Sequence, residues 1–114
     1  MKVLIVDDDP HLRDLYKLEL EDEKYEVFVA SSGKEALEVF DKEDIDIVTL
    51  DILMPGMDGI EVLRRMKEKK PDLPIIMSTA YDYRDDFSVW ASDAYVVKSS
   101  DMTELKSTIK KLLS

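Results

Sequence analysis

Short apolar runs alternate with longer amphipathic stretches along this chain, and this alternation limits the folds that it can adopt more than any other feature. The runs are rich in valine, isoleucine and leucine. They cover residues 3–6, 27–30, 45–50, 74–79 and 94–97. Runs that are short and nearly continuously apolar are typical of strands covered on both faces, as in parallel sheets.

Two of the intervening stretches carry clear signals for the start of a helix. Asp9 can cap a helix whose first residue is Pro10, because proline is well tolerated in the first turn. Ser32 can cap a second helix, and Glu35 three residues later completes a capping box. We therefore expect helices that start at Pro10 and just after Ser32.

The remaining stretches differ in the strength of their helical pattern. A third helix is predicted from about Asp58 to a stop at Pro71. The last helix is the clearest, because Asp101 caps it, Glu104 stands at the box position and a single apolar stripe follows. Within residues 79–98 the helical pattern is weak.

Strand and helix alternate five times along the sequence, which predicts an α/β fold. Because right-handed crossovers connect parallel strands, we expect a (βα)5 doubly wound, flavodoxin-like domain with a five-stranded parallel sheet in the strand order 2-1-3-4-5. A chain of 114 residues without a linker or a low-complexity segment fits one domain over residues 1–114.

Charge and composition argue against several functions. The formal net charge of −10 disfavours binding to nucleic acid or to an anionic membrane. No apolar run approaches the ~20 residues that span a bilayer, and the N-terminal run is too short for a secretory signal. The chain has no cysteine, so it lacks disulfides and thiolate metal ligands, and a reducing cytoplasm is the expected compartment.

The chemically informative residues stand at the ends of the predicted strands. Asp7 and Asp8 follow the first strand, Asp51 the third, Thr79 ends the fourth, and Lys98 follows the fifth. Taken singly, each has an ordinary explanation as a turn former, a β-former or a solvated strand end. In an open parallel sheet, however, the carboxyl ends of the strands form one ligand-binding edge. Three carboxylates that converge there repel one another unless a cation such as Mg²⁺ lies among them, while a lysine and a threonine suit a bound phosphoryl oxygen.

These residues belong to a set of motifs that occur in order along the chain. The set comprises Ile5–Asp9, Asp46 with Asp51, Met54–Gly59, Thr79–Ala80 and Tyr95–Lys98. With these motifs the chain resembles the receiver domain of bacterial two-component response regulators, of the single-domain chemotaxis and sporulation-phosphorelay type. The resemblance covers essentially the whole chain.

The resemblance implies that Asp51 is the phosphoacceptor, which takes a phosphoryl group from a histidine kinase or a histidine phosphotransfer protein. It also implies a Mg²⁺ site, with Mn²⁺ as an alternative metal. Asp8 and Asp51 would coordinate the metal directly, the backbone carbonyl of Leu53 would be a third ligand, and Asp7 would act mainly through a bound water.

Three further residues would respond to the phosphoryl group. Lys98 would pair with it, Thr79 would hydrogen-bond one of its oxygens, and Tyr95 stands where the family has its switch aromatic. The implied function is a phosphoacceptor signalling domain that switches a face for an unknown downstream protein, as a monomer or a phosphorylation-dependent dimer. Such a domain is not an enzyme beyond catalysing its own phosphorylation and a slow dephosphorylation, which we expect because bulky Leu53 and Tyr81 flank the acceptor.

The chain departs from the family pattern after the fourth strand. Ser99 stands where a proline usually follows the lysine, so we expect a trans peptide bond between Lys98 and Ser99. The segment 79–98 is a few residues shorter than usual, so the fourth helix is expected to be abbreviated or displaced.

Three alternative functions have weaker support. A phosphohydrolase of the haloacid-dehalogenase type needs a second acid two residues after its nucleophile, where this chain has Leu53. A flavodoxin-like cofactor carrier needs a phosphate-binding loop after the first strand, whereas the acids Asp7–Asp9 would repel phosphate. The closest alternative is an interaction module with a receiver fold that acts independently of phosphorylation.

Overall fold

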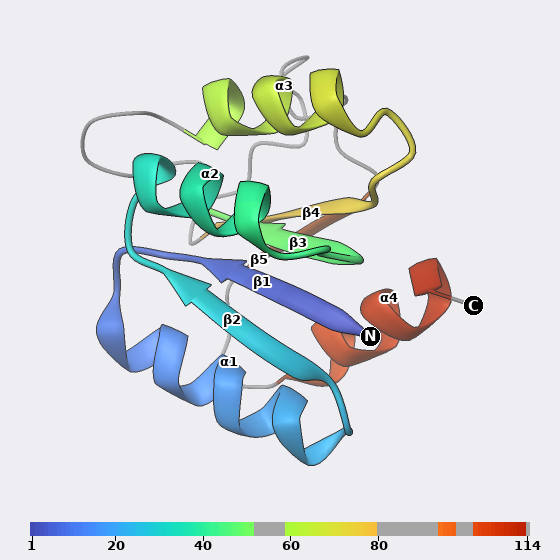
Figure 1. Cartoon of the computed structure of the whole chain (residues 1–114). Coiled ribbons are helices and arrows are strands. Elements are labelled where there is room, and N and C mark those ends of the chain that lie inside the picture. The colour runs from blue at the N-terminus through green and yellow to red at the C-terminus, as the bar shows by residue number, and fades with distance from the viewer. Residues whose placement is uncertain (52–58, 80–93, 98–101, 114) are drawn as a thin grey trace.

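The computed structural model describes residues 1–51, 59–79, 94–97 and 102–113, and at residues 59, 60, 79, 94, 95 and 97 it describes the backbone alone. The strands are β1 (Lys2–Val6), β2 (Glu26–Ala30), β3 (Ile47–Leu50), β4 (Ile75–Thr79) and β5 (Ala94–Val97). The helices are α1 (Pro10–Asp22), α2 (Gly33–Lys42), α3 (Gly59–Lys69) and α4 (Thr103–Leu113), as Figure 1 shows.

The strands form one parallel sheet in the order β2-β1-β3-β4-β5, which confirms the predicted doubly wound topology. Val6 of β1 is aligned with Leu50 of β3, and Leu50 is aligned with Met77 of β4. The strand order reverses between β1 and β3. Open parallel sheets bind their ligands at such a reversal, outside the carboxyl ends of the strands.

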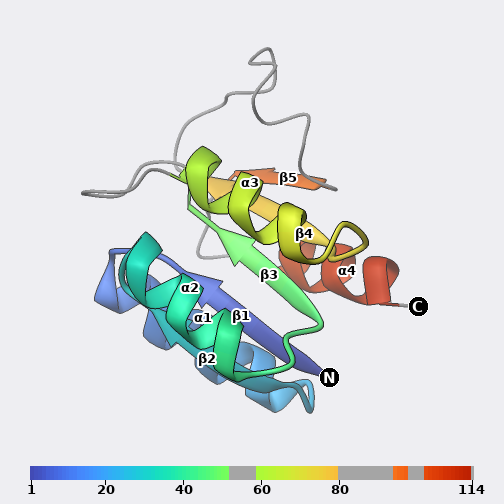
Figure 2. The ribbon, with the colours of Figure 1, turned by 45° about the horizontal axis from the view of Figure 1, so that its top comes forward.

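Helices cover both faces of the sheet (Figures 1 and 2). Each face has its own apolar core. α2 and α3 pack over a cluster that includes Leu4, Leu50 and Met77. α1 and α4 pack over a second cluster, which includes Ile5 and Ile76. Successive residues of a strand alternate between the two clusters, as expected for strands buried on both faces.

α1 begins where the sequence predicts it. The Asp9 carboxylate accepts hydrogen bonds from the backbone N–H of His11 at 2.9 Å and of Leu12 at 3.5 Å. Pro10 is the first residue of the helix. The cap satisfies two of the backbone donors that a helix start leaves unpaired.

α1 ends in a turn that glycine usually makes. Lys24 has a φ of 76°, in the left-handed region. Its N–H donates to the carbonyl of Glu21 at 3.0 Å, and the N–H of Tyr25 donates to the carbonyl of Leu20 at 3.2 Å. These are the two hydrogen bonds of a Schellman motif, which turns the chain into β2.

α2 also has its predicted cap, with one difference. The Ser32 hydroxyl accepts a hydrogen bond from the Glu35 N–H at 3.2 Å. The Glu35 carboxylate, however, accepts from the N–H of Ser31 at 3.2 Å, one residue before the cap. The reciprocal half of the capping box is therefore displaced by one residue.

β3 is shorter than the apolar run that predicted it, because it begins at Ile47 rather than at residue 45. Asp46 is held beside the start of β1: its carboxylate accepts from the Lys2 N–H at 2.7 Å, and its own N–H donates to the Lys2 carbonyl at 2.9 Å. The Ile45 N–H donates to the carbonyl of Glu43 at 3.1 Å, so the chain is still turning at this point.

Three further expectations fall on residues outside the described ranges. They are the cap at Asp101, the abbreviated or displaced fourth helix, for which residues 80–93 are not described, and the trans peptide bond between Lys98 and Ser99. α4 itself starts at Thr103, with Glu104 in its first turn.

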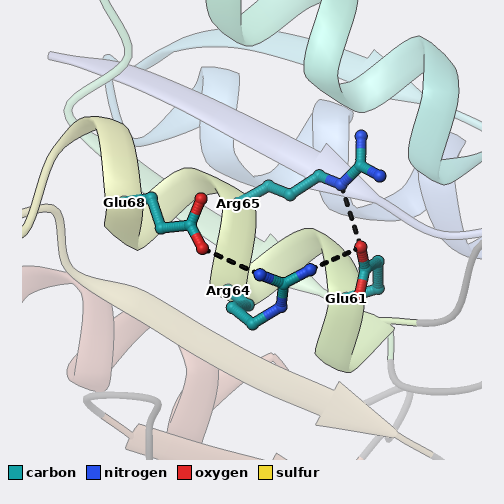
Figure 3. Close-up of polar contacts among 4 residues, drawn as sticks. All are labelled: Glu61, Arg64, Arg65 and Glu68. Atoms are coloured by element: carbon teal, nitrogen blue, oxygen red, sulfur yellow. Dashed lines mark hydrogen bonds and ion pairs between the residues drawn. The ribbon is translucent and has the colours of Figure 1, made fainter.

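Charged side chains form a network along the exposed side of α3 (Figure 3). The Glu61 carboxylate accepts from Arg64 at 2.8 Å and from Arg65 at 3.0 Å. Arg64 also donates to Glu68 at 2.8 Å. Hydrogen bonds from Arg64 and Arg65 hold the pKa of Glu61 below its ordinary value of 4.5. Exposed networks of this kind contribute little to stability because water and salt screen them.

Replacing Glu61 with glutamine should lower the melting temperature slightly at neutral pH and low salt. Because the folded-state pKa of Glu61 lies below 4.5, its charge stabilises the fold above that pH, and the contribution is lost as the pH falls through the lowered value. The difference in melting temperature between the wild type and Glu61→Gln, followed by circular dichroism, should vanish in acid and shrink in molar salt. Glu68→Gln should have a smaller effect, and a Glu61→Gln difference that persisted in acid would contradict the prediction.

Candidate functional site

The carboxyl edge of the sheet brings three polar residues into one row. Asp7, Asp51 and Ser78 directly follow residues of β1, β3 and β4 that are aligned across the sheet. The β1–β3 ladder continues into this row, because the Asp51 N–H donates to the Val6 carbonyl at 3.0 Å. The side chains of the three residues are only 2%, 4% and 3% exposed, respectively. Because side chains alternate along a strand, the row faces the layer that holds α1 and α4.

Hydrogen bonds from the sheet and from the start of α1 hold Asp7 in place. Its backbone N–H donates to the Ala30 carbonyl of β2 at 3.1 Å. Its carboxylate accepts from the Asp9 N–H at 2.9 Å, and its backbone carbonyl accepts from the Arg13 guanidinium at 2.8 Å. The loop between β1 and α1 is therefore tied to both the sheet and the second turn of the helix.

Asp7, Asp8 and Asp51 form a carboxylate cluster at this edge. One carboxylate oxygen from each residue lies within 4.8 Å of those of the other two. Asp7 and Asp51 are buried, whereas Asp8 is exposed. At an effective dielectric constant of ~20, two unit charges ~5 Å apart repel by roughly 3 kcal/mol. This repulsion favours a cation among the three carboxylates.

The donor set fits a hard divalent cation. All three side chains offer carboxylate oxygens, and one exposed carboxylate leaves room for metal-bound water. Mg²⁺ prefers such oxygen ligands and keeps several waters, whereas softer metals favour histidine or cysteine. The chain has no cysteine, and its single histidine, His11, is exposed on α1.

The other predicted site residues follow or end the same strands in the sequence, but the structure does not describe their side chains. Thr79 is the last residue of β4, and its backbone is aligned with Val97 of β5. Tyr95 is the second residue of β5 and is aligned with Met77. Leu53 and Lys98 lie outside the described residues.

Two residues at this edge were not predicted as site residues from the sequence. Arg13 contacts Asp7 across the N-terminal cap of α1. The sequence indicates this contact only by placing a basic residue one turn into the helix. Ser78 precedes Thr79 in an otherwise apolar strand. The sequence marks it only by a hydroxyl at a position where an aliphatic side chain would fill the core.

A family model for the response regulator receiver domain matches residues 3–110. The chain belongs to this family. Receiver domains are regulatory domains, so the carboxylate cluster lies in a signalling module. Of the helices in the described ranges, none combines the length and hydrophobicity that a membrane-spanning segment requires.

Solved structures of receiver domains are closely similar over nearly the whole chain. The response regulator TrrA from Thermotoga maritima, solved in complex with Mg²⁺-BeF, is 50% identical with a TM-score of 0.94, over 98% of both chains. TrrA in complex with the histidine kinase ThkA is 51% identical with a TM-score of 0.93, over 99% of this chain and 98% of that one. A CheY-like receiver domain protein from Methanospirillum hungatei is 33% identical with a TM-score of 0.92, over 98% of this chain and 92% of that one.

Replacing Asp8 with asparagine should have opposite effects on the stability of the receiver domain with and without Mg²⁺. Without the ion, the substitution removes one of three mutually repelling charges, so the melting temperature should rise. With millimolar Mg²⁺, the wild type should gain stability through linkage and the variant should gain clearly less. Scanning calorimetry measures both shifts.

Asp14→Asn is the matched control, because it removes the same charge from an exposed position on α1 outside the cluster. It should leave the Mg²⁺-dependent shift unchanged. Equal Mg²⁺-dependent shifts in the wild type and in Asp8→Asn would contradict the assignment of Asp8 to the cation site.

Proposed function

We propose that this receiver domain accepts a phosphoryl group on Asp51 from a histidine kinase or a histidine phosphotransfer protein. The observation that carries the proposal is the convergence of Asp7, Asp8 and Asp51 at the carboxyl edge, where the strand order reverses. The similarity to TrrA supports it, because that protein has been solved both with Mg²⁺-BeF and with its histidine kinase partner ThkA.

Asp51 is suited to the role of nucleophile. Its carboxylate needs no general base, since it attacks as the anion. One carboxylate oxygen forms the new bond to phosphorus while the bond between phosphorus and the donor histidine nitrogen breaks, and the nitrogen keeps the electron pair. The rigid end of β3 fixes the direction of attack, which is most of what phosphoryl transfer requires of a protein.

Asp8, Asp51 and the backbone carbonyl of Leu53 would hold Mg²⁺, with Asp7 acting through a bound water; Mn²⁺ suits the same oxygen ligands. The bound cation would supply charge neutralisation for the carboxylate and the phosphoryl oxygens. Asp7 keeps its position through the bonds from Asp9 and Arg13. The loop thus presents its acids without rearrangement.

Lys98, Thr79 and Tyr95 would carry the response to phosphorylation. Lys98 would pair with the phosphoryl oxygens and Thr79 would donate a hydrogen bond to one of them. Tyr95 would follow the movement of the loop after β4. The phosphoryl group would then favour one of two packings of the partner-binding face.

We further propose that residues 1–114 act as one cytoplasmic signalling unit, without catalytic activity toward other substrates. Its partners would be the phosphodonor and a downstream protein, not nucleic acid or membrane, because the net charge of −10 repels anionic surfaces. It would act as a monomer or as a phosphorylation-dependent dimer.

Replacing Asp51 with asparagine should abolish phosphorylation. Wild-type protein incubated with Mg²⁺ and acetyl phosphate should gain the mass of one phosphoryl group, read by intact-protein mass spectrometry. The matched control is Asp44→Asn, which neutralises an acid that is 87% exposed shortly before β3 and should be phosphorylated normally. If the wild type formed no adduct with any phosphodonor, the phosphorylation-independent interaction module would be the better function.

Self-dephosphorylation should be slow. Leu53 and Tyr81 are bulky and uncharged, so they should hinder an attacking water rather than recruit it. Leu53→Asn should shorten the lifetime of the phosphorylated protein, because a polar side chain can orient water. A wild-type half-life of seconds, measured from the decay of the phosphorylated mass, would contradict the prediction.

A further inference from the structure

Ser78 carries a buried hydroxyl that has no partner. Its side chain is 3% exposed, and among the described residues its Oγ is the buried side-chain polar atom without a hydrogen bond. Buried polar atoms are nearly always paired, because an unpaired one loses its hydration without compensation. An exception at the end of a strand, next to a reactive carboxylate, requires a physical explanation.

The neighbours of Ser78 within the sheet are unequal. On the β5 side it is aligned with Val96, and on its own strand the preceding residue of the same face is Ile76, both buried and apolar. On the β3 side, the register places it beside Asp51. Asp51 is therefore the polar neighbour that Ser78 has within its own row.

Asp51 has different neighbours on its two sides. Toward β1 lies Asp7, which belongs to the carboxylate cluster. Toward β4 lies Ser78. The cation and the hydroxyl therefore approach Asp51 from opposite directions, and a donor on the β4 side does not compete with the metal ligands.

We propose that Ser78 is a hydrogen-bond donor to the phosphorylated form of Asp51, an inference that rests on the proposed function. Neighbouring strands lie ~4.8 Å apart, so a change of the serine χ1 rotamer brings its hydroxyl within reach of an oxygen on the modified side chain. The hydroxyl is unpaired in the unmodified protein and paired after phosphorylation. The hydrogen bond gained on phosphorylation favours the phosphorylated state over the unmodified one, because the balance between two states follows the difference in their interaction free energies.

The test compares the affinity for beryllofluoride, which mimics the phosphoryl group, with the affinity for Mg²⁺ alone. Ser78→Ala should weaken beryllofluoride binding roughly ten- to a hundredfold, the size of one hydrogen bond to a charged group. It should leave the Mg²⁺ affinity unchanged, since the cation lies on the other side of Asp51. Without ligands the variant should melt at the wild-type temperature or above it, because an unpaired hydroxyl has been removed.

Two variants complete the design. Ser78→Thr keeps the hydroxyl and should bind beryllofluoride more tightly than Ser78→Ala. Thr49→Val removes a buried hydroxyl from the same face of β3, one row further from the edge, and should leave the affinity unchanged. Titration calorimetry gives both affinities.

Equal beryllofluoride affinity in the wild type and in Ser78→Ala would overturn the role of Ser78 while leaving the proposed function intact. So would a parallel loss of Mg²⁺ binding and thermal stability, which marks a structural defect. If the wild type bound no beryllofluoride and formed no phosphoryl adduct, both proposals would fail.

Discussion

The hydrogen-bonded register between β1 and β3 is the constraint on which the rest of the structure depends. The bond from the Asp51 N–H to the Val6 carbonyl extends the ladder beyond β3, so Asp51 and Asp7 end side by side. A slip of one residue would turn every side chain of the strand to the opposite face and separate the two carboxylates. The slip would also carry Leu50 out of the core under α2 and α3. Apolar packing on two faces of the sheet therefore fixes the geometry of the polar site at its edge.

α1 connects this edge to the body of the molecule. Asp9 caps the helix, and its own N–H is bonded to the Asp7 carboxylate. Arg13 reaches back from the second turn to the Asp7 carbonyl. The loop that presents the acids is thus part of the start of the helix. A movement of the Asp7 carboxylate would have to break its bond from the Asp9 N–H, so this part of the site is held in place before anything binds.

The features that the sequence predicts correctly are those set by local chemistry. Strand and helix periods follow from which faces are buried, and Asp9 and Ser32 act as caps through backbone groups a few residues away. The convergence of Asp7, Asp8 and Asp51 could be predicted because parallel strands end at a common edge. The left-handed conformation of Lys24 could not be predicted, since lysine has no preference for it and the Schellman hydrogen bonds at the end of α1 impose it. The unpaired Ser78 could not either, because pairing depends on rotamers and on neighbours distant in sequence.

The carboxyl edge combines two features that are unfavourable in a protein interior. Carboxylates of Asp7 and Asp51 lie close together under little solvent, and beside them the Ser78 hydroxyl is buried without a partner. Neither would survive in a core selected for stability alone, because smaller apolar residues would remove both penalties. A bound cation would relieve the first, and the oxygen atoms of the proposed phosphoryl group on Asp51 would relieve the second. A ligand shifts a conformational equilibrium only by the difference between its affinities for the two conformations. A site that is unfavourable when empty and relieved when occupied would therefore increase the shift that the ligand causes. The two apolar cores hold the fold, and the proposed response to phosphorylation would depend on the polar edge.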